Sequence, residues 1–248
     1  MTAQDSSLDA LAALGDDLRR RMYAFIRAAH RPITREEAAA NVGISRKLAA
    51  FHLDKLVAAG LLRARYDKPA DLRRAGRAPK IYEPDDTTIA VTIPPRHHDV
   101  LSGILLEGIL AETGEENARA AALRIARARG ETLGATERDR LRPGRLGAER
   151  ALTLSEEILT RCGFEPTRET PGLLRLSNCP FHPLAAHAPD LVCAINHAYL
   201  TGFLHGLGAV TIDAELAPAP GACCVELRTA PRPGAPPSAS ESSSGCSA

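Results

Sequence analysis

The sequence predicts a mostly helical protein that ends in a small α+β domain. Three observations lead to this fold class. Apolar residues recur at intervals of three and four near the N-terminus, further helical segments occupy residues 95–135, and short strand-like runs alternate with helices over residues 150–230. A chain of 248 residues is long enough for one to two domains, each with its own core.

The composition is that of a soluble protein. The start, MTAQDSSLDALAALGDD, has no basic stretch followed by an apolar segment, so it does not resemble a secretion signal. No apolar run approaches the roughly 20 residues needed to cross a bilayer. We therefore expect a cytoplasmic protein that does not bind membranes and whose thiols stay reduced.

Charge is distributed unevenly along the chain. Residues 1–80 hold 16 Lys and Arg against 9 Asp and Glu, whereas the remainder is acidic. The basic part predicts a polyanionic partner for the N-terminal region alone.

The first expected helices lie within residues 8–41. Apolar residues at helical spacing predict one amphipathic helix over residues 8–30. Thr34 and Glu37 have the spacing of a capping box, in which each side chain accepts a hydrogen bond from the other residue's backbone amide. A second helix is therefore expected to start there and to end near Asn41.

A third helix is expected after a tight turn. Gly43 can adopt the left-handed conformation of that turn, and Ser45 can cap the helix. The face expected to pack on the other helices consists of Ala49, Leu53, Leu56 and Val57. The opposite face is basic, as in a helix that enters the major groove of DNA. The DNA-contacting residues predicted here are Ser45, Arg46, Lys47, Ala50, Phe51 and Lys55.

Two strand-like runs follow, Leu61–Tyr66 and Lys80–Glu83, with a basic loop between them. A basic loop between strands behind a recognition helix is typical of a wing, which contacts phosphates or the minor groove. The cations of this loop are Lys68, Arg73, Arg74 and Arg77, of which the three arginines complete the predicted DNA contacts.

These residues carry a resemblance to a known family. The stretch PITREEAAANVGISRKLAAFHLDKLVAAGLL, with the later GRAPKIYEP, resembles the winged helix-turn-helix of ArsR-like bacterial transcriptional regulators. The resemblance implies a DNA-binding domain, which we place at residues 8–88, and double-stranded DNA as its partner.

The middle of the chain leaves two interpretations open. The segment RHHDVLSGILLEGILAE is apolar around much of its circumference, and the Ala-rich EENARAAALRIARARGETLG follows it. These helices, over residues 95–135, either form a dimer interface or cover the C-terminal domain. Dimerisation is favoured because such regulators read two half-sites about 34 Å apart. Residues 137–150 are expected to form a charged linker and residues 231–248 a disordered tail.

Residues 150–230 predict a compact α+β domain with several cysteines. Cys179 follows a strand at a corner imposed by Pro180, and Cys193 lies on the next helix. Strand alternation directs Cys223 to the interior and Cys224 away from it. Thiolates select zinc, copper(I) or iron-sulfur clusters, but buried structural thiols explain the spacing equally well. The histidines considered for a fourth position are His182, His197 and His205.

A second resemblance favours a metal or cluster. NCPFH, LVC and PGACCVEL are similar to segments of the C-terminal domain of Suf-type repressors, which control iron-sulfur assembly genes and hold a cluster on cysteines. It implies Cys179, Cys193 and Cys223 as ligands of an iron-sulfur cluster, with zinc as the alternative. Some members carry a further cysteine where this chain has Leu207, and His205 is the nearest replacement.

Together these observations predict a homodimeric repressor that binds an inverted repeat and responds to a cluster or metal. One alternative is the same regulator with a metal-free C-terminal domain that binds an organic effector or a protein partner. Another is a cysteine hydrolase using Cys179 with His182 or His205. It lacks a motif for an orienting third residue, so we expect no enzymatic activity.

Overall fold

The computed structural model describes residues 3–66 and 78–230. The chain divides into two compact units, residues 1–92 and residues 93–248. The predicted DNA-contacting loop residues Arg73, Arg74 and Arg77, as well as Lys68 and the predicted tail, lie outside the described residues. Within those described residues, no helix is both long and apolar enough to cross a bilayer.

The first unit combines four helices with a three-stranded antiparallel sheet of order β1-β3-β2. The helices are α1 (Ala3–Leu14), α2 (Asp17–Ala29), α3 (Arg35–Val42) and α4 (Arg46–Ala58), and the strands are β1 (Ile33–Thr34), β2 (Leu62–Tyr66) and β3 (Lys80–Pro84). Its core lies between the helices and includes Met22, Ile26, Leu53, Leu56 and Tyr82.

The single helix predicted over residues 8–30 is wrong, because the chain forms α1 and α2 there. Asp16 adopts an extended conformation, and its Oδ1 accepts a hydrogen bond of 2.9 Å from the Arg19 amide. This cap starts a new helix. The apolar periodicity continues through the break, so periodicity alone did not reveal it.

The start signals predicted for α3 and α4 are confirmed. The Glu37 amide donates to Thr34 Oγ1 at 3.2 Å, and the Thr34 amide donates to Glu37 Oε2 at 2.8 Å. Gly43 adopts a left-handed φ of 73° between the helices. The Leu48 amide donates to Ser45 Oγ at 3.3 Å. Local capping therefore fixes the helix-turn-helix.

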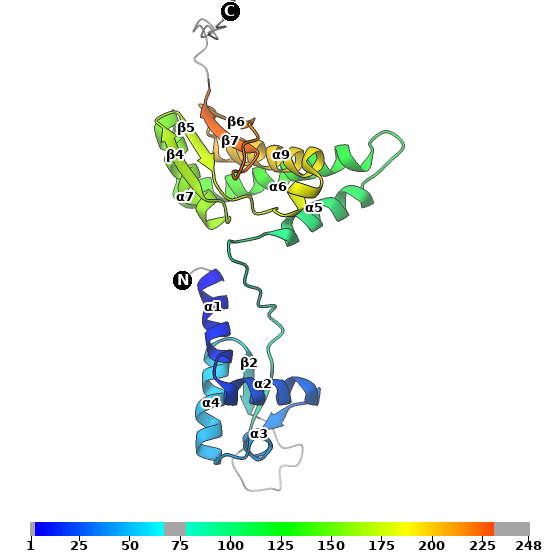
Figure 1. Cartoon of the computed structure of the whole chain (residues 1–248), viewed down its shortest axis with the longest axis vertical. Helices are drawn as coiled ribbons and strands as arrows, with labels where there is room; N and C mark the ends of the chain where they lie inside the picture. The colour runs from blue at the N-terminus through cyan, green and yellow to red at the C-terminus, as the bar shows by residue number, and fades with distance from the viewer. Residues whose placement is uncertain (1–2, 67–77, 231–248) are drawn as a thin grey trace, which may run out of the picture. The chain divides into compact units, whose positions relative to one another are not determined.

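The second unit packs helices against a four-stranded antiparallel sheet of order β4-β5-β7-β6 (Figure 1). The helices are α5 (His98–Leu110), α6 (Ala118–Leu141), α7 (Ala148–Arg161), α8 (Leu184–His187) and α9 (Pro189–Leu207). The strands are β4 (Pro166–Thr170), β5 (Leu173–Leu176), β6 (Ile212–Leu216) and β7 (Val225–Thr229). The short helix α8 was not predicted.

The charged linker expected at residues 137–150 begins too early, because α6 continues to Leu141. Glu137 lies in this last stretch and accepts hydrogen bonds from Arg140 at 2.6 Å and from Arg161 of α7 at 2.8 Å. The charges that suggested a solvated linker thus tie two helices together.

Glycines bring the backbones of α6 and α9 into direct contact. A Cβ atom added at Gly130 would lie 1.9 Å from the Tyr199 carbonyl oxygen, and one added at Gly202 would lie 2.0 Å from that of Arg127. Only residues without a side chain permit this approach. Both central helices therefore pack within the same unit as the α+β elements.

Candidate functional site

The two faces of α4 divide as the sequence predicted. Ala49, Leu53 and Leu56 are fully buried against the other helices. On the opposite face Phe51 is 55% exposed, although a phenylalanine is usually buried. The other predicted contact residues on this face are Arg46, Lys47 and Lys55, which are exposed, and Ala50, which is half-buried.

Individual residues of this face differ in what they can offer a ligand. Arg46 is exposed and lies 3.8 Å from Glu36, a loose ion pair. Lys55 places its ammonium 5.8 Å from the centre of the Phe51 ring. Lys47 has no polar partner among the residues that the structure describes, so its ammonium is free to meet a phosphate. Ser45 uses its hydroxyl to cap α4.

Sequence reasoning missed Leu48 on this face. Leu48 is 43% exposed and lies three residues before Phe51, so the two form an apolar pair on one side of the helix. Its position three residues from a predicted contact residue was the signal that could have found it. An exposed apolar pair flanked by cations suits both thymine methyl groups and phosphates.

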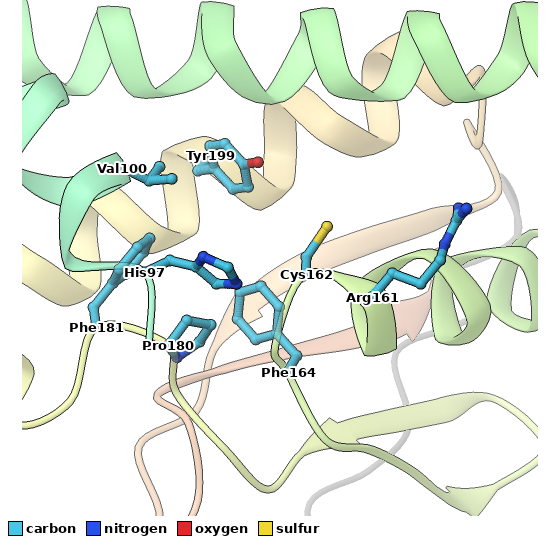
Figure 2. Close-up of a pocket in the computed structure, with 8 residues that line it drawn as sticks. All are labelled: His97, Val100, Arg161, Cys162, Phe164, Pro180, Phe181 and Tyr199. Carbon is cyan, nitrogen blue, oxygen red and sulfur yellow. The ribbon is translucent and has the colours of Figure 1, made fainter. Parts of the chain in front are cut away.

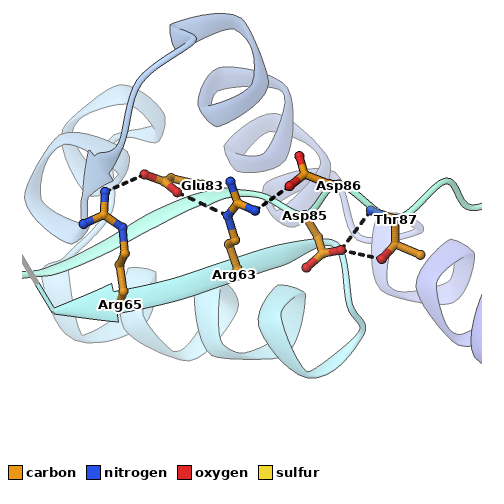
Figure 3. A network of polar contacts seen from close by, with 6 residues as sticks. All are labelled: Arg63, Arg65, Glu83, Asp85, Asp86 and Thr87. Atoms are coloured by element: carbon orange, nitrogen blue, oxygen red, sulfur yellow. Dashed lines mark hydrogen bonds and ion pairs between the residues drawn. The ribbon is translucent and has the colours of Figure 1, made fainter.

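Arginines on the wing strands are held by carboxylates (Figure 3). Arg63 donates to Glu83 at 3.2 Å and to Asp86 at 2.5 Å, and Arg65 donates to Glu83 at 2.9 Å. The Arg65 hydrogen bond is the main cause that keeps the pKa of Glu83 below its usual value. These arginines therefore join β2 to β3.

In the second unit, four cysteines meet at one corner. Cys179 follows β5, Cys193 lies on α9, and Cys223 and Cys224 directly precede β7. The thiol of Cys223 interacts with those of Cys179 and Cys224, and Cys224 also interacts with Cys193. All four thiols are free. The predicted ligands Cys179, Cys193 and Cys223 are thus brought to one cluster.

The prediction that Cys224 points away from the interior is wrong, since Cys224 is only 8% exposed. Strand alternation was applied to both residues, but β7 begins at Val225. Because the chain has not yet entered the strand at Cys223 and Cys224, both side chains can turn inward.

Asn196 is a further polar residue of this corner that the sequence did not single out. It is fully buried on α9, and its Nδ2 donates to the sulfur of Cys223 at 3.1 Å. Its Oδ1 has no hydrogen-bond partner within the described part of the chain. Its position three residues after Cys193 was the available signal, because residues at this spacing share a helix face.

The cluster favours protonated thiols. The contact with Cys223 and burial raise the pKa of Cys179 far above its usual value, although backbone amides of Phe181 and His182 oppose the rise. The Cys179 contact lowers the pKa of Cys223, but Cys224 and burial outweigh it and raise that pKa to about 11. In the described residues, no group of three or more His, Cys, Asp or Glu side chains is arranged to hold a metal ion. The donor atoms suit a soft metal, but they are not assembled around one centre.

The structure does not bring His205 to the cysteines. The His205 side chain is 71% exposed, and its Nδ1 lies 3.0 Å from Glu131 Oε1. It follows Cys193 by twelve residues, or about 18 Å along the helix axis. His197 is engaged with the Ala214 carbonyl at 3.0 Å, and His182 is exposed beside Cys179. The side chains that join Cys179, Cys193 and Cys223 at this corner are therefore Asn196 and Cys224, not a histidine.

Hydrogen bonds connect the loop between β5 and α8, residues 177–183, to the segment that enters the second unit, residues 93–97. We call these the cysteine loop and the entry segment. Arg96 donates to the Asn178 side chain and, at 3.0 Å, to the Cys179 carbonyl. The side-chain amide of Asn178 donates to the Pro95 carbonyl at 3.2 Å, and the backbone amide of His97 donates to the Pro180 carbonyl at 2.9 Å. We call these contacts the entry clasp.

Comparison with known proteins supports the DNA-binding interpretation. Residues 14–65 match a protein family described as a helix-turn-helix domain. This stretch runs from the end of α1 to β2 and includes all of α4. The match indicates a DNA-binding transcriptional regulator. No curated protein and no solved structure matches the chain.

Proposed function

We propose that the chain is a homodimeric transcriptional repressor that binds an inverted repeat and is controlled by a metal or iron-sulfur cluster on its cysteine corner. The observation that carries the proposal is the four-cysteine cluster hydrogen-bonded through the entry clasp to the residues that follow the helix-turn-helix unit. In this proposal, the clasp ties a sensing site to the segment through which the chain continues from the helix-turn-helix unit.

The exposed face of α4 supports direct reading of DNA. Lys47 and Arg46 supply positive charge at the start of the helix, where recognition helices contact base edges. Phe51 and Leu48 supply apolar contacts suited to thymine methyl groups. Because the wing arginines Arg63 and Arg65 already pair with carboxylates, α4 supplies the specific contacts in this proposal.

An apolar surface on α5 supports dimerisation. Leu106, Ile109 and Leu110 are exposed by 59%, 61% and 76%, although the rest of this helix packs on α6. Three large apolar side chains on neighbouring turns are costly in water and typical of a surface that another chain covers. In this proposal, a second copy covers them, and two α4 helices then read two half-sites.

The donor chemistry of the cysteine corner supports a soft metal or cluster. Cys179, Cys193, Cys223 and Cys224 are neighbours in a largely buried place, and thiolates prefer zinc, copper(I) and iron-sulfur clusters. A bound metal or cluster would supply a charged centre that holds the cysteine loop, α9 and the segment before β7 together. Because the pKa values of Cys179 and Cys223 are raised, loading requires proton loss from these two thiols.

Control of DNA binding requires that the ligand favour one conformation of the protein over another. The entry clasp is the element we assign to this coupling. Arg96 and His97 bond directly to the backbone of Cys179 and Pro180. Any rearrangement of the cysteine loop therefore acts on residues that lead to the DNA-binding unit.

Metal analysis tests the proposal. Anaerobically purified protein should contain iron with acid-labile sulfide, or zinc, and Cys179→Ser, Cys193→Ser and Cys223→Ser should each lose it. Cys162→Ser is the matched control, because Cys162 lies outside the cluster and should leave the metal content unchanged. Colourless, metal-free protein would instead favour the same regulator with an organic effector or protein partner, for which the second unit offers the pocket described next.

A further inference from the structure

The geometry points to a second ligand site in the second unit, a pocket for one small neutral aromatic molecule. The pocket has a volume of about 160 Å³ and lies between the entry segment, the end of α7, the cysteine loop and α9. Figure 2 shows the side chains around it, which are His97, Val100, Arg161, Cys162, Phe164, Pro180, Phe181 and Tyr199.

The size and lining of the pocket select a single ring. An apolar cavity of about 150 Å³ is known to bind benzene, so the volume suits one six-membered ring with a small substituent. Phe164, Phe181, Pro180 and Val100 line the pocket with apolar side chains. Rings packed on rings in this way gain more than their buried area alone predicts.

Polar groups in the wall select one hydrogen-bonding substituent. The Tyr199 hydroxyl has no hydrogen-bond partner within the part of the chain that the structure describes. Burial raises the pKa of Tyr199 to about 12, so the hydroxyl stays neutral and can donate. The imidazole of His97 faces the same space (Figure 2). A phenol has a ring of the size that fits the pocket and a hydroxyl that can form a hydrogen bond with Tyr199 or His97.

Charge in the pocket is already balanced. The guanidinium of Arg161 donates to Glu137 Oε2 at 2.8 Å, so it does not attract an anion as a free arginine would. Burial raises the pKa of the Cys162 thiol, which keeps it uncharged. The pocket therefore favours a neutral ligand over a carboxylate of the same size.

The pocket is linked to regulation through its walls. Asn178 donates to the Gly163 carbonyl at 2.6 Å and to the Pro95 carbonyl at 3.2 Å, and so joins three segments that line the pocket. A molecule in the pocket contacts these segments together and stabilises the entry clasp. Its effect on DNA binding rests on the proposed function, whereas its binding does not.

Binding is tested with phenol, benzene and benzoate on the full-length, reduced and metal-free chain by ligand-observed NMR. Phenol should bind with a dissociation constant below about 1 mM, and benzoate about tenfold more weakly. Absence of phenol binding overturns the site. Equal binding of benzoate overturns the assignment to neutral ligands.

Two substitutions separate the ring contacts from the hydrogen bond. Tyr199→Phe should weaken phenol about two- to tenfold and leave benzene unchanged, since one hydrogen bond is removed. Val100→Phe fills the pocket and should abolish both. Val210→Phe is the matched control, because Val210 is 80% exposed and does not line this pocket. Retained benzene binding shows that the pocket of Tyr199→Phe is intact, so this variant tests the hydrogen bond even if Val100→Phe does not fold. Unchanged phenol affinity in Tyr199→Phe overturns the assignment of the Tyr199 hydroxyl as the hydrogen-bonding group.

Coupling is tested with a DNA duplex that the full-length chain selects from a random library. Saturating phenol should change the dissociation constant for this duplex about fivefold, and Val100→Phe should remove the effect. Phenol that binds without changing DNA affinity overturns the coupling but not the site. If the chain selects no duplex, the proposed function fails while the phenol result stands on its own.

Discussion

The two units differ in how their structures are determined. In the first unit, short-range signals fix the elements: Thr34 and Glu37 cap α3, Gly43 makes the turn and Ser45 caps α4. In the second unit, contacts between distant residues do so, such as those of Gly130 with Tyr199 and of Cys179 with Cys223. Local determination suits a module that presents one rigid helix, whereas long-range determination brings residues from distant parts of the chain together at one corner.

The largest expected effect is on the packing of α6 against α9. Gly202→Val should destabilise the second unit by more than about 3 kcal/mol, because a side chain there would collide with the Arg127 backbone. Chemical denaturation of the full-length chain should show early loss of the second unit and an unchanged transition for the first. Gly114→Ala is the control, since its new Cβ meets nothing within 4 Å. Equal stability of both variants would contradict the conclusion that contacts between distant residues determine the structure of the second unit.

The next effect is on DNA affinity. Lys47→Ala combined with Phe51→Ala should weaken binding to a selected duplex at least about 30-fold, since each base-reading contact contributes about 1–3 kcal/mol. Arg65→Ala should change affinity little, because its charge is already paired with Glu83. Fluorescence anisotropy measures both, with sedimentation to verify an unchanged oligomeric state. A larger loss of affinity for Arg65→Ala than for the α4 variant would show that the wing, not α4, makes the main DNA contacts.

Metal loading should also depend on pH. The pKa of Cys223 is raised to about 11 and that of Cys179 is also raised, so both thiols are protonated at neutral pH and lose protons on binding. Zinc affinity should therefore rise with pH between 6 and 9, about tenfold per unit for each proton displaced. Competition titrations with a chelator measure it. Affinity independent of pH would mean that the thiols are not the ligands.

The smallest expected effect tests local capping in the first unit. Hydrogen bonds from Arg31 and Thr34 lower the pKa of Glu37 to about 2. The contribution of Glu37 to the stability of the first unit is therefore full above its usual pKa of 4.5 and is lost as the pH falls toward 2. Glu37→Ala should cost about 1 kcal/mol at pH 7 and less at low pH, because it removes the acceptor of the Thr34 amide and the partner of Arg31. Hydrogen exchange of α3 amides measures it, with Glu36→Ala as the control. Equal effects of both substitutions would show that general helix charge, not the capping box, matters.

What the sequence could predict follows the same division. Ala49, Leu53 and Leu56 were assigned to the core and Phe51 to the surface, because one helix period determines both. Asp16 was missed, since a cap inside a continuing apolar pattern gives no change in period. In the second unit the meeting of Cys179 with Cys223 was predicted from strand alternation, which directed Cys223 inward, and from a resemblance. Asn196 and Cys224 were missed because their positions depend on where β7 begins and how α9 faces it.

The backbone contact between α6 and α9 has a mechanical consequence. At Gly130, Gly134, Gly202 and Gly206 the two backbones meet without side chains between them, so sliding one helix past the other would bring backbone atoms into collision at these positions. The pair therefore acts as a fixed frame. In the proposed function, movement in the second unit is left to the loops on that frame, among them residues 178–182, and a signal from the cysteines would leave through them.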